Sequence, residues 1–249
     1  MKIFLAGDSF GLGEFRYGGG LRTHGGLAQY LKEHGYVVFN TSKGGSSSGE
    51  ALTRLQSAIT VHYEPGDLVL FIISDPIREL RPYSENLTQA VIEAGSITAA
   101  SLKMFYKICA SIDQQPWKTH LIGGVCSYTP DMVQDYPNIV PLVPSWSDLL
   151  VGHLPFYEPY KNKYWSAAQG WRNGLVDIAL IEKQNPELAR QVVDEMRQLN
   201  ARAKNVFKED IFHPDGKHPN KTGHLWLFNY IVEKLNLPPV DNLVKPLYN

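Results

Sequence analysis

The chain has 249 residues and a formal net charge of −1, from 24 basic and 25 acidic side chains. This balance excludes a strongly basic surface, so we expect neither nucleic acid nor an anionic membrane as the main partner. A hydrophobic share of 43% is sufficient for a large buried core, and we expect residues 1–249 to form a single α/β domain.

Two cysteines, Cys109 and Cys126, lie in apolar segments and do not suggest a disulfide framework. This composition favours a reducing compartment. The apolar run at the N-terminus is shorter than that of a signal peptide, and no other apolar run is long enough to cross a membrane. We therefore expect a cytoplasmic protein without a membrane partner.

A first strand is predicted from Ile3 to Ala6, and it ends at Gly7 with Ser9 two positions later. A serine on a sharp turn after a buried strand is held by the scaffold while its hydroxyl stays open to a substrate. That is the arrangement that a nucleophilic hydroxyl needs. All residues of Gly-Asp-Ser also favour ordinary turns, so this motif alone does not separate a nucleophile from a plain strand end.

Two loops poor in large side chains follow the first two strands. Residues 11–20 form a glycine-dense loop without the dinucleotide fingerprint, and a helix is predicted within 21–34. The second strand, at 36–39, leads into a glycine- and serine-rich loop at 40–49. A linker would have this composition too, but the helix predicted at 50–62 favours a functional loop at the carboxyl edge of a parallel sheet, where ligands bind.

Residues 67–73 are a continuous apolar run, which predicts a central parallel strand covered on both faces. Ser74-Asp75-Pro76 ends this strand, because proline disfavours its continuation. A long helix is predicted at 84–112, a fourth strand at 118–123 and a fifth at 137–143. Strands and helices alternate, as in an open α/β sheet.

The segment 143–175 has little periodicity and contains Trp146, Trp165 and Trp171. We expect an irregular insertion packed on the α/β core. Its aromatic side chains could line a sugar or acyl pocket, or they could serve packing and interfaces. An amphipathic helix is predicted at 186–207, after this insertion.

Near the C-terminus, Asp215 and His218 lie three positions apart in a loop that contains Gly216 and two prolines. With this spacing the carboxylate can accept from one ring nitrogen while the other faces a hydroxyl. The pair would then supply a general base and the group that orients it.

A metal site is the alternative interpretation of this region, because His213, Asp215, His218 and His224 lie close together in the sequence. Histidine is the commonest metal ligand in proteins. However, the flanking prolines restrict convergence of these side chains, and no other ligand cluster occurs in the chain. We therefore expect no metal.

The motifs together resemble those of the SGNH hydrolase superfamily, the GDSL-like esterases. Gly7-Asp8-Ser9-Phe10, a glycine loop after the second strand and Asp215-Gly216-Lys217-His218-Pro219 occur in the family's order. The resemblance implies a flavodoxin-like three-layer α/β/α fold with a central parallel sheet and no cofactor. It also implies ester hydrolysis through an acyl-enzyme, with Ser9 as nucleophile, His218 as base and Asp215 as its orienter.

The resemblance further implies an oxyanion hole made by the backbone N–H groups of Ser9 and Gly45, or Gly44 if the register slips by one. The family's third donor is an asparagine after the third strand, where this chain has Ser74. We expect Ser74 to donate in its place, since losing one donor typically lowers turnover about 10²- to 10³-fold. Four residues near these groups are expected to contact the substrate: Asp8, Gly44, Asp75 and Arg78.

The leading hypothesis is a carbohydrate or small-acyl esterase, with deacetylation as the expected reaction. The alternative is a catalytically impaired member that serves as a structural or glycan-binding component, for example of a virion. The intact serine, histidine and aspartate favour the first, and the missing asparagine favours the second. The run from Ser74 to Arg78 is similar to that of some phage-encoded members, which suggests a phage origin. A homo-oligomer and a virion assembly both stay open as partners.

Overall fold

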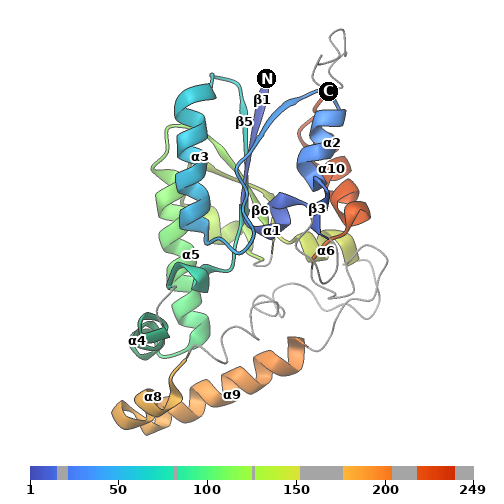
Figure 1. Cartoon of the computed structure of the whole chain (residues 1–249). Helices are drawn as coiled ribbons and strands as arrows, with labels where there is room; N and C mark the ends of the chain where they lie inside the picture. Colours follow the sequence, from blue (N-terminus) through green and yellow to red (C-terminus); the bar gives the residue numbers. More distant parts are fainter. Residues whose placement is uncertain (16–21, 81–83, 125–126, 152–175, 204–217, 239–249) are drawn as a thin grey trace.

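The centre of the structure is a five-stranded parallel sheet with the strand order β4-β1-β5-β6-β7 (Figure 1). The computed structural model describes residues 1–15, 22–80, 84–124, 127–151, 176–203 and 218–238. The strands are β1 (Lys2–Ala6), β4 (Val37–Asn40), β5 (Leu68–Ile73), β6 (Thr119–Gly123) and β7 (Ile139–Val143). Taken in chain order, these strands follow the flavodoxin-like 2-1-3-4-5 arrangement, which confirms the predicted fold class.

Helices cover both faces of this sheet and complete the three layers (Figure 1). One face packs against α3 (Ser48–His62) and α5 (Ile97–Asp113), and the other packs against α2 (Gly26–Glu33), α6 (Trp146–Val151) and α10 (Lys221–Lys234). Side chains of the central strand alternate between the two cores: Val69, Phe71 and Ile73 of β5 face one core, whereas its other three residues face the second. Every residue of β5 is buried, as its continuous apolar run predicts.

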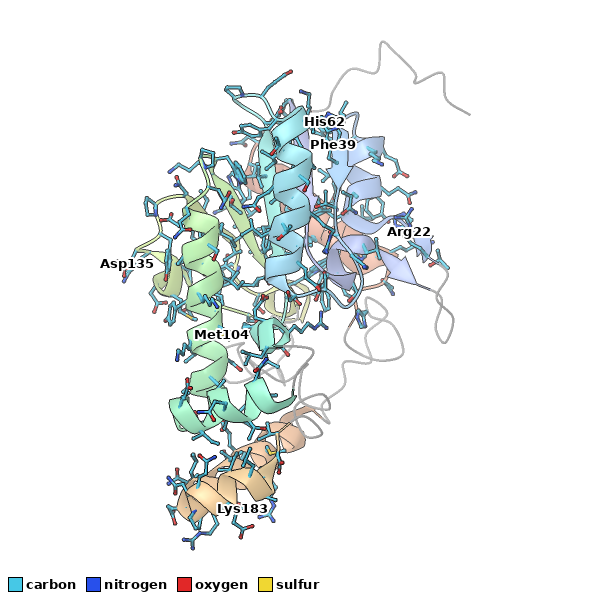
Figure 2. The ribbon with its side chains drawn as sticks, turned by 60° about the vertical axis from the view of Figure 1, so that its left-hand side comes forward. Arg22, Phe39, His62, Met104, Asp135 and Lys183 are labelled. Carbon is cyan, nitrogen blue, oxygen red and sulfur yellow. The ribbon has the colours of Figure 1, made fainter. Side chains whose placement is uncertain are left out.

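An aromatic stack joins strands β1 and β4 to helix α3. The rings of Phe4 and Phe39 are stacked with centroids 5.0 Å apart, and the His62 ring is stacked on Phe39 at 4.5 Å; Figure 2 labels Phe39 and His62. Offset stacking of this kind adds to the free energy gained by burying the rings. The stack therefore ties the end of α3 to the edge strand β4.

The glycine-dense loop after β1 has more regular structure than the sequence predicts. The described residues between 9 and 24 contain α1 (Ser9–Leu12) and a two-stranded antiparallel ribbon of β2 (Glu14–Phe15) and β3 (Arg22–His24). The helix predicted within 21–34 is shorter, since α2 begins only at Gly26. Residues 16–21 lie outside the described part of the chain.

The single helix predicted at 84–112 is two helices, α4 (Ser84–Ala94) and α5. Gly95 has φ of +79°, a left-handed conformation that ends α4. The Ser96 hydroxyl then accepts a hydrogen bond from Ala99 N at 3.0 Å and begins α5 as its N-cap. Periodicity continues across the break, which is why the sequence pattern alone did not reveal it.

Helices α8 (Ile178–Gln184) and α9 (Pro186–Ala203) form a hairpin beyond α4, at the end of the molecule where Figure 2 labels Lys183. Leu188 and Val192 of α9 are buried in the same core as α3 and α5. The Glu195 carboxylate accepts hydrogen bonds from the N–H groups of Ile97 at 2.8 Å and Thr98 at 2.9 Å. These N–H groups have no partner within α5, so α9 supplies the cap for that helix.

The first part of the predicted insertion at 143–175 is regular. Helix α6 follows β7 directly, and Trp146 is only 1% exposed, so this tryptophan belongs to the core. The remaining insertion, with Trp165 and Trp171, lies outside the described residues, as does Cys126. Within the part that the structure describes, no helix has both the length and the apolar character needed to span a bilayer.

The 3₁₀ helix η1 (Pro76–Leu80) follows β5 at the carboxyl edge of the sheet, and η2 (Pro130–Val133) precedes β7. The strand order reverses between β1 and β5, since β4 follows β1 in the chain but lies on its other side. Loops from β1, β4 and β5 therefore meet at a topological switch point. In open α/β sheets this is the usual place for a ligand.

Candidate active site

The turn after β1 places Ser9 at the carboxyl edge of the sheet. Gly7 allows β1 to approach β5 closely, because a Cβ at this position would lie 2.9 Å from Cβ of Ile72. The Asp8 carboxylate accepts a hydrogen bond from Phe10 N at 3.0 Å and caps the short helix α1, which begins at Ser9. Ser9 itself is partly exposed.

The structure brings Ser9 and His218 together. Ser9 Oγ lies 3.1 Å from His218 Nε2, a distance at which the hydroxyl can donate its proton to the ring nitrogen. His218 precedes α10, whose N-cap Asn220 accepts hydrogen bonds from Thr222 N and Gly223 N. The start of α10 thereby holds the backbone next to the histidine in place.

Aromatic side chains pack against the His218 ring. The ring of Phe10 lies 5.3 Å from the imidazole, centroid to centroid, and Phe10 also makes an edge contact with Trp146 at 5.6 Å. Phe10 is adjacent to the candidate nucleophile and is 4% exposed. Sequence reasoning did not identify Phe10 and Trp146 as site residues, because their apolar side chains look like ordinary core positions.

Asp215, the predicted orienter of His218, lies outside the described residues, as does His213. The remaining two members of the alternative metal site have other contacts. His218 contacts Ser9, while His224 is fully buried and its Nδ1 accepts from Leu27 N at 3.3 Å. The described residues contain no group of three or more His, Cys, Asp or Glu side chains that could hold a metal ion.

A buried polar cluster lies directly behind Ser9. The Asp8 carboxylate is fully buried and accepts hydrogen bonds from Arg78 at 2.8 Å and from Ser74 Oγ at 3.1 Å. Burial raises the pKa of Asp8 above its ordinary value, and the Arg78 guanidinium, the Phe10 N–H and the Ser74 hydroxyl act against this effect. The cluster thus joins the turn after β1 to the loop after β5.

These positions differ from the roles that the sequence suggested. Ser74 is 0% exposed, and its hydroxyl contacts Asp8 and the carbonyl of Ser46 at 3.0 Å, so its single proton is directed to these two acceptors. Asp8 and Asp75 are 0% and 3% exposed, and Asp75 accepts from Ile77 N at 3.2 Å. Both carboxylates are thus buried, and the Arg78 guanidinium pairs with Asp8 in this structure.

The predicted glycine loop lies beside the nucleophile turn. The carbonyl of Gly7 accepts hydrogen bonds from Lys43 N and from Ser46 Oγ, both at 3.2 Å. These two residues flank Gly44 and Gly45, which are exposed. Within the described chain, neither glycine N–H donates a hydrogen bond to another group, so both can donate to a ligand.

Comparisons with known proteins give structural matches alone. No family model matches the sequence, and no curated protein matches it. The solved structure of TesA is 15% identical with a TM-score of 0.42, over 94% of this chain and 98% of TesA. Axe2, an acetylxylan esterase from Geobacillus stearothermophilus, is 15% identical with a TM-score of 0.41, over 96% of this chain and 95% of Axe2.

The esterase EstA from Pseudoalteromonas sp. is 14% identical with a TM-score of 0.41, over 94% of this chain and 96% of EstA. These likenesses extend over nearly the full length of each pair of chains. At such identities the names of these proteins do not assign an activity to the present chain.

Proposed function

We propose that the protein is a serine ester hydrolase of the SGNH type, with Ser9 as nucleophile and His218 as general base. The contact of 3.1 Å between Ser9 Oγ and His218 Nε2 carries this proposal. It joins a partly exposed hydroxyl to an imidazole at the switch point of the sheet, where a substrate has access. The order of the sequence motifs supports the same assignment.

In the proposed reaction, Ser9 Oγ attacks the ester carbonyl carbon while His218 Nε2 takes the hydroxyl proton. The carbonyl oxygen becomes an oxyanion, which the N–H groups of Ser9 and Gly45 stabilise. The C–O bond to the alcohol then breaks, and His218 returns the proton to the leaving alcohol. Water, activated by the same imidazole, hydrolyses the acyl-enzyme and releases the acid.

Asp215 is the proposed partner of the second ring nitrogen of His218. It lies three positions before the histidine, and its carboxylate would fix the tautomer in which Nε2 accepts from Ser9. We propose a small acyl group, such as acetyl, on a carbohydrate or another alcohol as the substrate. From the resemblance of the run between Ser74 and Arg78 we also propose a phage origin and an association with a virion.

The test is hydrolysis of an aryl acetate by wild type, Ser9→Ala and His218→Gln. We expect wild type to release the phenol with saturation kinetics and both variants to lose at least about 10³-fold in kcat while they stay folded. Ser57→Ala, on an exposed turn of α3, is the matched serine control and keeps wild-type turnover. A folded wild-type protein without hydrolysis would instead favour the structural or glycan-binding alternative.

A further inference from the structure

The 3₁₀ helix η1 carries two adjacent charged residues that bind different parts of the site. Arg78 donates to the Asp8 carboxylate at 2.8 Å and to the Ser46 carbonyl at 3.3 Å. Glu79 accepts from Gly49 N at 3.1 Å, at the start of α3. Burial raises the pKa of Glu79, and its hydrogen bonds act against this effect. The loop after β5 is therefore bound to the loops after β1 and β4.

The groups that Arg78 binds lie next to both proposed oxyanion donors. Asp8 immediately precedes Ser9, and Ser46 immediately follows Gly45. The Arg78 side chain is 14% exposed and the Asp8 side chain is 0% exposed, so solvent screens this ion pair little. One atom, Arg78 Nη1, contacts the carboxylate, the carbonyl and Ser74 Oγ, which lies 2.9 Å away.

We infer that Arg78 is a positioning residue, which fixes the N–H groups of Ser9 and Gly45 relative to each other through Asp8 and the Ser46 carbonyl. The inference rests on the proposed hydrolase function and deepens it. With the Ser74 hydroxyl bound in the cluster, the proposed oxyanion donors are two backbone N–H groups, whose directions are set by the conformation of their loops. Their spacing then depends on the contacts that join the loops, and a shift of about 1 Å can cost about a hundredfold in rate.

The kinetic parameter that changes distinguishes a positioning role of Arg78 from direct substrate binding by Arg78. A substrate-binding arginine would change KM when it is replaced, because it contacts the ground state. A positioning arginine changes kcat, because the oxyanion forms only after attack. The conservative change to lysine keeps a positive charge and N–H donors, but its shorter side chain does not place the ammonium where Arg78 Nη1 lies, so it restores part of the rate.

The experiment measures kcat and KM for an aryl acetate in wild type, Arg78→Lys and Arg78→Met, with folding checked by circular dichroism. We expect Arg78→Met to lower kcat by about tenfold to a hundredfold, with KM within about twofold of wild type. The kcat of Arg78→Lys should lie between those of wild type and Arg78→Met. Arg190→Met is the control, because Arg190 is exposed in α9 and pairs only with Glu187 there, and it should match wild type.

Arg78→Met leaves the Asp8 carboxylate buried without its ion partner, which can prevent folding. The double variant Asp8→Asn/Arg78→Met removes both charges and supplies the measurement in that case, with the same expected loss in kcat. The inference is overturned if either folded variant keeps the wild-type kcat, or if only its KM rises. The proposed function still stands in that case, provided that wild type turns over the ester and Ser9→Ala does not. If wild type itself does not hydrolyse the ester, the proposed function fails first.

Discussion

Ser9 Oγ lies 3.1 Å from His218 Nε2, although 209 positions separate the two residues in the chain. The fold achieves this because the turn after β1 carries Ser9 and the start of α10 holds His218 next to it. Phe10 adds a direct contact, since its ring centroid lies 5.3 Å from that of the His218 ring. The site is therefore made by the chain's two ends, with packing from the nucleophile's own neighbour.

Phe10→Leu should lower kcat strongly and lower the free energy of unfolding only modestly. Leucine fills much of the buried space but cannot make the ring contact that holds the imidazole, so we expect kcat to fall by about tenfold. The free energy of unfolding should fall by about 1–2 kcal/mol. Phe105→Leu is the control: this ring is 0% exposed in α5 and should show the stability loss without the kinetic one. Equal kcat losses in both variants would contradict a specific role for Phe10.

Ser74→Asn restores the residue type of the family at this position, but we expect no gain in turnover. The site is 0% exposed and its hydrogen bonds lead to Asp8 and Ser46, so the larger amide would overfill the space. Unfolding in denaturant should show a loss of about 1–3 kcal/mol. An increase in kcat for the folded variant would show that position 74 reaches the oxyanion.

Glu195→Ala should destabilise the protein, because the carboxylate caps the start of α5 through the N–H groups of Ile97 and Thr98. We expect a loss of about 1–2 kcal/mol, measured by urea unfolding. Glu187→Ala is the matched control in the same helix. Its ion pair with Arg190 is exposed, so the loss should stay below about 0.5 kcal/mol. Similar losses for the two variants would mean that the cap contributes little.

Stability should fall with acid partly through His120 on β6. Burial lowers the pKa of His120 below its ordinary value of 6.5, with a backbone hydrogen bond at Val69 acting against this. Below pH 6.5 the unfolded chain binds a proton that the folded chain does not, so stability decreases from there down to the folded pKa. Thermal unfolding of His120→Gln should depend less on pH across this window. An unchanged pH dependence would contradict the contribution of His120.

Much of the fold could be predicted, because its signals are local. The strands are apolar runs that end at breakers such as Gly7 and Pro76, and β7 within 137–143 was found in the same way. The α4–α5 break was missed because a glycine is tolerated inside helical patterns, and only its positive φ shows that Gly95 ends the helix.

The site was predictable to the extent that sequence motifs mark it. Ser9 and His218 stand in recognisable motifs, and the structure places them in contact. The Asp8–Arg78 ion pair was not predictable, since it joins residues 70 positions apart and no local pattern assigns an arginine its partner. The same holds for Ser74, whose direction toward Asp8 depends on how three loops meet.

The most direct test of the central claim is to treat the folded protein with a fluorophosphonate probe and locate the adduct by mass spectrometry. An activated serine forms a covalent phosphonyl ester, whereas an ordinary surface serine does not react. We predict one adduct on Ser9 in wild type and no labelling in Ser9→Ala. Equal labelling of the two proteins, or no adduct on Ser9 of the folded wild type, would contradict it.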